Sequence, residues 1–316
     1  MIEKRKLWFY FKIFLSVFLL IYLICLVDTE KVLATLKRSS CIIFIAPVIS
    51  LIGFWFASSR WKILLSSNNL IISSWYAFYG YMVGFFYGTF LPGNLGGDIF
   101  RIQLCVRQTK CKISTATSIV ILERVCGVLV LFSMIFYILI CPPSTLTNLT
   151  PAVNTQRMLP FAAAGIMGII LFIFGCRMGR HILQKKKFKG IFGYIQKAVL
   201  PFSTIRGGIL FQALILSALF QSTDIFVSFL LSYAIHLSLS LKIFFLIIPL
   251  AYFTALLPIS LGGLGVREGT LVFLLTMFGI SASDAVTFSM LVCLNRFAIG
   301  GIGGALNIIE TIISPK

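Results

Sequence analysis

The sequence is poor in charge, and above all in acid. Of its 316 residues, 11% are Asp, Glu, Lys or Arg and only nine are acidic, whereas 59% are hydrophobic. A soluble domain of this length needs more polar surface. Several apolar stretches approach or exceed the ~20 residues that span a bilayer, and the alternating pattern of a membrane β-barrel is absent. The composition therefore predicts an all-α polytopic membrane protein.

Residues that hold metals or form disulfide frameworks are also scarce. The two histidines, His181 and His236, lie far apart in the sequence, and the eight cysteines are scattered without a C-x-x-C pair. Most of the cysteines lie in apolar segments, where Cys behaves as a small hydrophobic residue. We expect no metal and no cofactor.

Basic residues are in excess, with a formal net charge of +18. In a soluble protein this charge would suggest nucleic acid, but no basic segment is interleaved with aromatics as a nucleic-acid site would be. Residues 177–206 contain eight Lys or Arg and no acid. Such segments face the cytoplasm and anionic lipid. We therefore expect a membrane surface, and not nucleic acid, beside these bases.

Six segments are long enough to cross the membrane, and four shorter ones accompany them. The predicted crossings are 7–27, 41–59, 113–140, 159–176, 209–235 and 285–309, and the short segments are 75–91, 99–112, 242–257 and 270–280. The bases at 4–6 favour an uncleaved first helix with its N-terminus inside, and Arg60 and Lys62 indicate an inside end of the second.

A glycine-rich, charged motif occurs twice. Residues 91–97 and 257–263 both read L-P-x-x-L-G-G, and in both an Arg follows four residues after the second Gly, at Arg101 and Arg267. Charged, glycine-rich backbone at membrane depth is costly unless it lines an enclosed or water-filled cavity. Two copies of this feature indicate a function.

Loop charge favours a re-entrant path for both motifs. If each motif is the tip of a hairpin that enters and leaves on one side, both basic segments, 107–112 and 177–206, lie inside. Each half then reads helix, helix, re-entrant hairpin, helix. We predict inverted pseudo-repeats, 7–141 and 159–309, joined by an external loop at 141–158, with about six crossings plus two hairpins in a single transmembrane domain. Both termini are then cytoplasmic.

The motifs and two helix arginines form the candidate site. Arg stays protonated and presents a planar fork suited to phosphate or carboxylate, and glycine turns leave backbone N–H groups free for an anion. The predicted anion or lipid-headgroup residues are Arg101, Arg124, Arg267, Arg296, Gly96, Gly97, Gly262 and Gly263. We expect the four arginines to face a common cavity near the midplane.

Other readings of these residues stay open. The arginines could pair internally, Arg124 with Glu123 or Asp98 and Arg267 with Glu268, and the glycines could serve close helix packing. The three acids Asp98, Glu123 and Glu268 could orient the arginines, relay protons or act as a base. Asp224, in the helix predicted at 209–235, could be a proton or ion site, or could bond across helices.

These motifs carry a resemblance to a known family. The runs 91–98 with Arg101, 122–124, 257–269 and 295–296 resemble the membrane domain of lysylphosphatidylglycerol synthases and related stand-alone flippase-like proteins. The resemblance covers nearly the whole chain. It implies a protein of the inner membrane that handles lipids; in the bifunctional synthases this domain translocates the aminoacylated lipid. A separate soluble C-terminal domain makes that lipid, and because the chain ends at Lys316 without it, we expect no synthase activity.

The sequence thus favours a flippase-like transporter rather than an enzyme. Its substrate would be an anionic phospholipid or a polyprenyl-phosphate lipid moved between leaflets of the cell membrane. One alternative is a lipid-modifying transferase, such as a glycosyl transferase with Asp98 or Glu123 as base. Another is an accessory subunit of a separate lipid-synthesising enzyme.

Overall fold

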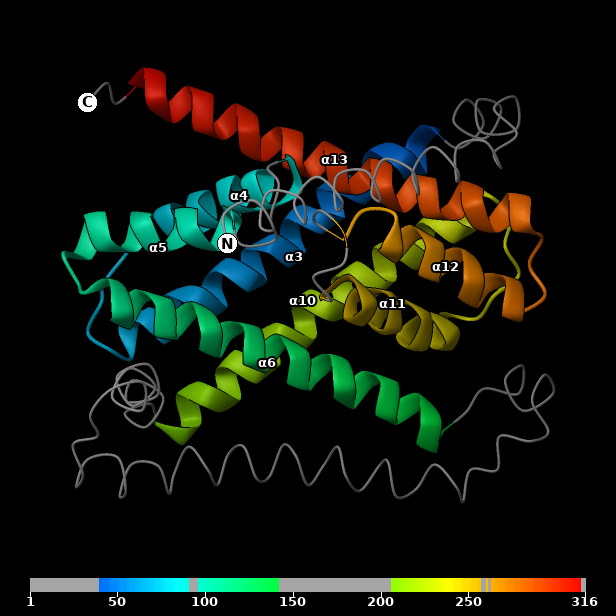
Figure 1. The fold of residues 1–316 in the computed structure, drawn as a ribbon, viewed down its shortest axis with the longest axis horizontal. Helices are drawn as coiled ribbons and strands as arrows, with labels where there is room; N and C mark the ends of the chain where they lie inside the picture. Colours follow the sequence, from blue (N-terminus) through cyan, green and yellow to red (C-terminus); the bar gives the residue numbers. More distant parts are fainter. Residues whose placement is uncertain (1–39, 91–95, 142–205, 257–259, 261–262, 314–316) are drawn as a thin grey trace, which may run out of the picture.

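The computed structural model describes residues 40–90, 96–141, 206–256, 260 and 263–313. Eight helices and no strand occur in these ranges (Figure 1). The helices are α3 (Ser40–Ser66), α4 (Ser74–Phe90), α5 (Gly96–Thr109), α6 (Ile113–Ile140), α10 (Gly207–Ala234), α11 (Leu241–Leu256), α12 (Val266–Met277) and α13 (Ala282–Ile313). The all-α prediction is confirmed for this part of the chain.

Four of these helices are long and apolar enough to span a bilayer. They are α3, α6, α10 and α13, with spans of 26 to 32 residues. About 20 residues suffice for the hydrocarbon core, so each can cross it with some tilt. These four correspond to four of the six predicted crossings. The other two, 7–27 and 159–176, lie outside the described residues.

Two helix boundaries differ from the prediction in ways that matter for the site. The helix expected at 41–59 continues to Ser66, so Arg60 is a buried residue within α3 and not a marker of its end. The helix expected at 270–280 begins at Val266, which places Arg267 and Glu268 in its first turn. Both helices extend because their charged residues find partners inside the protein, as the contacts of Arg60 and Glu268 show below.

The four short helices form two antiparallel hairpins. In the first, Gly97 of α5 lies against the backbone of Gly84 in α4, and the ring of Phe100 contacts Tyr79 and Tyr87. In the second, the hydroxyls of Thr254 in α11 and Thr270 in α12 are 2.9 Å apart. The α4–α5 and α11–α12 hairpins lie at opposite ends of the view in Figure 1.

Buried apolar residues join the open end of the α4–α5 hairpin to neighbouring helices. This cluster combines the end of α3, the start of α4, the end of α5 and the starts of α6 and α10. Its members include Trp61, Leu64, Ile72, Ala77, Cys105, Ala116 and Ala213. The starts of α4 and α6 and the ends of α3 and α5 therefore meet at one end of the bundle.

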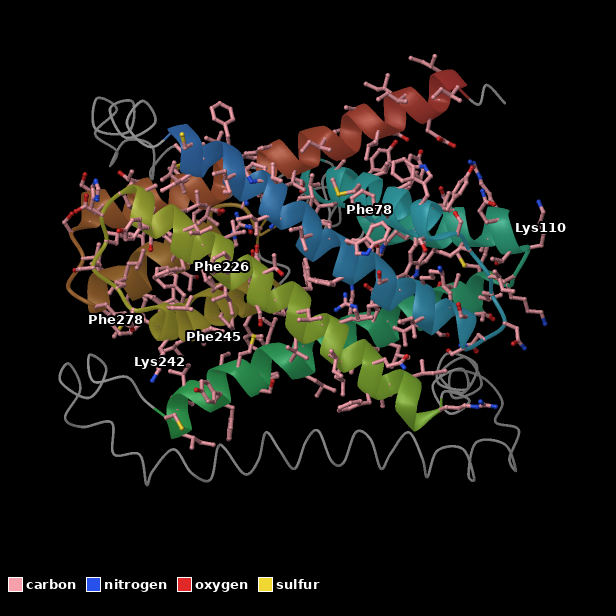
Figure 2. All side chains as sticks on the ribbon, turned by 180° about the vertical axis from the view of Figure 1, so that it is seen from behind. Phe78, Lys110, Phe226, Lys242, Phe245 and Phe278 are labelled. Atoms are coloured by element: carbon pink, nitrogen blue, oxygen red, sulfur yellow. The ribbon has the colours of Figure 1, made fainter. Side chains whose placement is uncertain are left out.

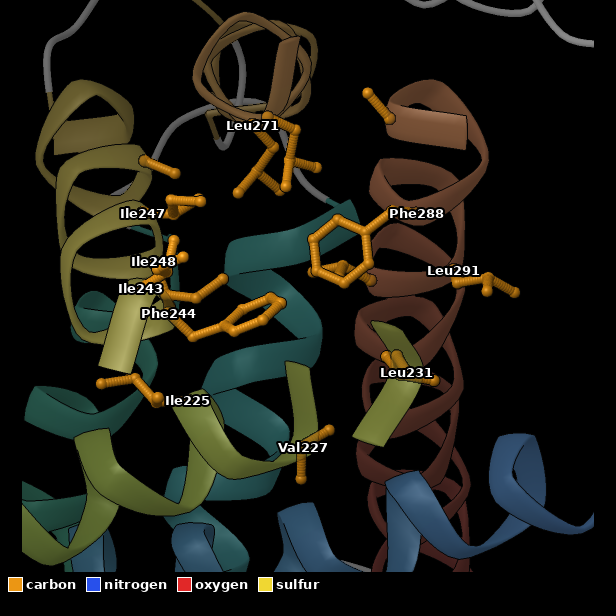
Figure 3. Packing of buried hydrophobic residues seen from close by; sticks show 14 of the residues in the cluster. Ile225, Val227, Leu231, Ile243, Phe244, Ile247, Ile248, Leu271, Phe288 and Leu291 are labelled. Atoms are coloured by element: carbon orange, nitrogen blue, oxygen red, sulfur yellow. The ribbon is translucent and has the colours of Figure 1, made fainter. Parts of the chain in front are cut away.

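A second cluster repeats this arrangement around the α11–α12 hairpin. It combines the second half of α10, α11, α12 and the first part of α13, and it also takes residues from α3 and α6. Figure 3 shows Ile225 and Leu231 of α10, Phe244 of α11, Leu271 of α12 and Phe288 of α13 in this packing.

The outer ends of the two hairpins point in opposite directions. Lys110, after α5, and Lys242, at the start of α11, lie at opposite ends of the bundle in Figure 2.

The helices form two sets along the chain, α3 to α6 and α10 to α13, and helices of one set also pack across those of the other. The ring of Phe54 in α3 contacts that of Phe220 in α10, with centroids 5.9 Å apart, and Gly53 lies beside Thr223. α4 packs against α13, and α11 packs against α6. Gly303 brings α13 so close to α4 that a Cβ there would overlap the carbonyl of Met82. The two sets thus share one packed body.

Candidate anion-binding site

The carboxylate of Glu123 is the centre of a buried charge cluster. Its Oε1 accepts hydrogen bonds from Arg60 at 2.7 Å and from the Tyr81 hydroxyl at 2.6 Å, and its Oε2 accepts one from Arg101 at 2.7 Å. The Glu123 side chain is 1% exposed. Arg60 also donates to the Ser217 hydroxyl of α10 at 2.8 Å. The cluster therefore ties five helices, α3, α4, α5, α6 and α10, to one carboxylate.

Asp98 extends this cluster towards the surface. Its Oδ1 accepts a hydrogen bond from Arg101 at 2.8 Å, and its Oδ2 pairs with Arg124 at 2.5 Å. The Arg101 side chain is 8% exposed and that of Arg124 is 42% exposed. Charges thus alternate from buried Arg60 through Glu123, Arg101 and Asp98 to accessible Arg124.

Aromatic rings complete the surroundings of Arg101. Its Cζ atom lies 4.5 Å from the ring centroid of Tyr81 and 5.5 Å from that of Trp61. A guanidinium over an aromatic face gains cation–π attraction. Arg101 is therefore held by two carboxylates and two rings, and its position is fixed by the protein itself. This charge cluster, called the first cluster below, contains three arginines and two carboxylates. It therefore holds one formal positive charge in excess.

The second motif builds a smaller cluster at the start of α12. Glu268 binds the Arg267 guanidinium at 2.5 Å and 3.0 Å, and its other oxygen accepts the Gly265 N–H at 2.7 Å. This carboxylate thereby satisfies one of the backbone donors left open at a helix start. The Arg267 Cζ lies 5.9 Å from the ring centroid of Tyr252, whose hydroxyl donates to Asp224 of α10.

Arg296 joins the second cluster and faces the first across aromatic rings. It lies within electrostatic range of Arg267 and Glu268, and its Cζ is 5.3 Å from the ring centroid of Phe85 in α4. Phe85 contacts Phe54 at 4.7 Å between centroids, and Phe54 contacts Tyr81 of the first cluster at 6.1 Å. An aromatic layer of Phe85 and Phe54 therefore connects the two clusters.

The four predicted arginines thus occupy two neighbouring clusters. Arg101 and Arg124 share Asp98, whereas Arg267 and Arg296 lie together beyond the aromatic layer. Two of the internal pairs considered from the sequence are present, Arg124 with Asp98 and Arg267 with Glu268. Pairing of Arg124 with its neighbour Glu123 is not what the structure shows, because Glu123 points to Arg60 and Arg101.

The second glycine of each motif allows a close approach of backbones. A Cβ on Gly97 would overlap the carbonyl of Gly84 in α4, and one on Gly263 would overlap Ala255 in α11. Gly263 also has a φ of 76°, a backbone angle that residues other than glycine rarely adopt. Gly96 is the first residue of α5, and Gly262 lies outside the described residues. Equivalent glycines thus hold both hairpins together, which is the packing role considered from the sequence.

Two buried hydroxyls near the motifs have no hydrogen-bond partner among the residues that the structure describes. They belong to Thr89, at the end of α4, and Ser260, within the second motif, and each residue is 5% exposed. Thr89 is one helix turn beyond Phe85, the residue under Arg296. A buried polar group without a partner is rare and needs an explanation, such as a ligand or ordered water.

Four contributors to the clusters were not among the predicted site residues: Arg60, Ser217, Tyr81 and Tyr252. Arg60 had a usable signal, since the apolar residues Trp61, Ile63, Leu64 and Leu65 continue the helix beyond it. The tyrosines had none, because their partners come from other helices. Among the described residues, no group of three or more His, Cys, Asp or Glu could hold a metal ion.

The family model for the lysylphosphatidylglycerol synthase TM region matches residues 9–304. The chain belongs to this family. The match spans both glycine motifs and all the residues of the two clusters. Membership in the lysylphosphatidylglycerol synthase TM region family, together with four membrane-spanning helices, makes the chain a membrane protein tied to lipid handling. A search of curated proteins found no match.

Proposed function

We propose that this protein is a flippase-like transporter that moves an anionic lipid, a phospholipid or a polyprenyl phosphate, between the leaflets of the cell membrane. The observation that carries the proposal is the pair of arginine clusters inside a membrane-spanning bundle, each at the start of a short helix. Charges at this depth are costly and are kept for function. Phosphate is the anion that the arginine fork and helix N-termini bind best.

The helix order supports an inverted repeat with two re-entrant hairpins. Both sets read long, short, short, long: α3 to α6 have 27, 17, 14 and 28 residues, and α10 to α13 have 28, 16, 12 and 32. The hairpins open at opposite ends, and α4 packs on α13 as α11 packs on α6. Transporters with such repeats bind substrate at the repeat interface near the midplane.

This topology places the basic end of the first hairpin in the cytoplasm. Lys110 then lies inside and Lys242, at the opposite end of the bundle, lies outside. We propose further that both termini are cytoplasmic and that the protein resides in the inner membrane. The two motifs approach the interface from opposite sides. The site between them can therefore open to one leaflet at a time as the halves rock.

Arg124 and Arg296 are the best placed to hold the headgroup. Arg124 is the accessible end of a cluster with excess positive charge, and Arg296 lies over Phe85, one turn from the Thr89 hydroxyl. A phosphate beside Arg296 would accept hydrogen bonds from its guanidinium and from the nearby Thr89 hydroxyl, and a phosphate at Arg124 would meet the accessible end of the first cluster. The buried Arg101 and Arg267 hold the two hairpins in place. They add positive electrostatic potential at the site but do not contact the headgroup.

The transferase alternative is less well supported. A general base must be able to take a proton, yet Asp98 and Glu123 each bind two arginines. The same contacts suit these acids as charge partners that orient the arginines. A role as accessory subunit would leave the clusters as a lipid-binding site without transport.

A lipid-protection assay tests the proposal. Purified protein is placed in liposomes that contain a trace of head-labelled phosphatidylglycerol, and the fraction of label that becomes accessible to a membrane-impermeant quencher is followed. The double substitution Arg124→Ala/Arg296→Ala should slow lipid movement by at least about tenfold. Arg107→Ala, which removes an exposed arginine at the end of α5, is the matched control and should move lipid as fast as wild type. Equal rates in all three proteins would exclude the arginine site.

A further inference from the structure

Asp224 differs from the other acids of the two clusters. Asp98, Glu123 and Glu268 each bind an arginine directly, whereas Asp224 accepts a hydrogen bond from a neutral phenol, that of Tyr252. Asp224 lies in the middle of α10, one of the membrane-spanning helices, and is partly exposed. Acids inside membrane-spanning helices mark ion paths and proton relays. Because its partner is neutral, Asp224 can gain a proton without breaking an ion pair.

The charges around Asp224 come from three other helices. Tyr252 belongs to α11, Arg267 to α12 and Arg296 to α13, and both arginines act on Asp224 electrostatically. On the α3 side, the neighbouring Thr223 meets Gly53, which carries no charge. Arg60 of α3 and Glu123 of α6 pair with each other beside Ser217, two turns earlier on α10 and about 10 Å away.

Protonation of Asp224 changes the charge balance of the second cluster. With Asp224 ionised, two carboxylates, Asp224 and Glu268, balance two arginines, Arg267 and Arg296. With Asp224 neutral, one positive charge is in excess, as it already is in the first cluster. An anion is therefore attracted to the second cluster only when Asp224 carries a proton.

We propose that Asp224 is a proton-binding site that couples proton uptake to binding of the anionic headgroup beside Arg296. This inference rests on the proposed transport function and identifies the proton as the ion whose movement is coupled to that of the lipid. The carboxylate takes a proton from water on one side, the headgroup enters the now positive cluster, and both leave on the other side. The only bond that forms and breaks is the O–H bond of the Asp224 carboxyl, while Tyr252 keeps its own proton.

The experiment measures the pH profile of lipid movement. Liposomes of neutral lipid with a trace of head-labelled phosphatidylglycerol are held at the same pH inside and outside, from mildly acidic to mildly alkaline. The wild-type rate should fall as pH rises, by up to about tenfold per pH unit on the falling limb. Asp224→Asn, which is always neutral, should give a flat profile. Asp284→Asn is the control and should keep the wild-type profile, because Asp284 is a partly exposed acid at the start of α13 whose carboxylate accepts a hydrogen bond from Ser281.

Tyr252→Phe provides a second variant in case Asp224→Asn fails to fold. It removes the donor that stabilises the ionised carboxylate, so the midpoint of the profile should move to higher pH. The coupling would be overturned if the wild-type rate of lipid movement did not change with pH, or if Asp224→Asn kept the pH dependence of wild type. It would also be overturned if folded Tyr252→Phe had the same midpoint pH as wild type. If neither wild type nor Asp284→Asn moves the lipid, the transport function itself fails, and the coupling fails with it.

Discussion

Arg60 and Glu123 form a buried ion pair at 2.7 Å, although 63 positions separate them in the sequence. The two side chains are 6% and 1% exposed. Arg101 binds the other oxygen of the same carboxylate. A single acid therefore pairs with two arginines within the membrane-spanning bundle, and removal of its charge leaves Arg60 without a carboxylate and Arg101 with Asp98 alone.

Loss of the Glu123 charge should strongly destabilise the fold. Glu123→Gln keeps the size of the side chain but leaves Arg60 and Arg101 without their shared carboxylate. Breaking a buried ion pair in this way costs about 3–5 kcal/mol, because the remaining charge stays buried. Thermal unfolding of the purified protein in detergent should show a clearly lower midpoint. Asp284→Asn, at a partly exposed position outside both clusters, should change the free energy of unfolding by no more than about 0.5 kcal/mol. An equal loss in both variants would contradict the cluster's role.

Gly97→Ala should separate α4 from α5. The added methyl group would overlap the backbone of Gly84, which cannot move aside without shifting the helix. Overpacking of this kind costs about 1–3 kcal/mol. Gly88→Ala in α4 is the matched control, since its Cβ would lie 4.0 Å from the nearest atom, in ordinary contact. We expect thermal unfolding to show a loss for Gly97→Ala and none for Gly88→Ala; the same loss in both would show that the close approach is unimportant.

Asp98→Asn should increase affinity for an anionic headgroup. Asp98 pairs with Arg124, so its charge competes with a bound phosphate for that guanidinium. Asparagine keeps an oxygen acceptor for Arg101 but removes the negative charge. We expect binding of phosphatidylglycerol in nanodiscs to tighten several-fold, which corresponds to about 1 kcal/mol. Weaker binding would instead mean that Asp98 serves to orient Arg124 for the lipid.

Cysteine labelling should place the open ends of the two hairpins on opposite sides of the membrane. In a background without native cysteines, Ser67→Cys and Lys110→Cys flank the α4–α5 hairpin, and Lys242→Cys lies at the start of α11. A membrane-impermeant reagent added outside intact cells should modify Lys242→Cys alone. The other two should react only after the membrane is opened. Reaction of Lys110→Cys and Lys242→Cys from one side would exclude the inverted repeat.

The sequence predicted the helices well and the cluster only in part. The limits of α6 agree with prediction at both ends, because its apolar run stops at charged or turn residues. The pairs Arg124–Asp98 and Arg267–Glu268 were also anticipated, since arginines and acids recur within and near the motifs.

Contacts between distant segments were beyond the sequence. Arg60 looked like the inside end of a helix because bases commonly gather there, and its acid lies on a helix far along the chain. Likewise, nothing near Asp224 predicts that Tyr252 of the next helix donates to it. The aromatic layer of Phe85 and Phe54 could not be predicted either, because it depends on how α3, α4 and α13 cross.

The claim that the two clusters hold an anionic headgroup is tested most directly by mass spectrometry of the lipids that remain bound to the purified protein. We predict that anionic lipid, a phospholipid or a polyprenyl phosphate, is enriched over the membrane from which the protein is extracted. This enrichment should be lost in Arg124→Ala/Arg296→Ala and kept in Arg107→Ala. Bound lipid that matches the bulk membrane, or anionic lipid retained equally by all three proteins, would contradict the account.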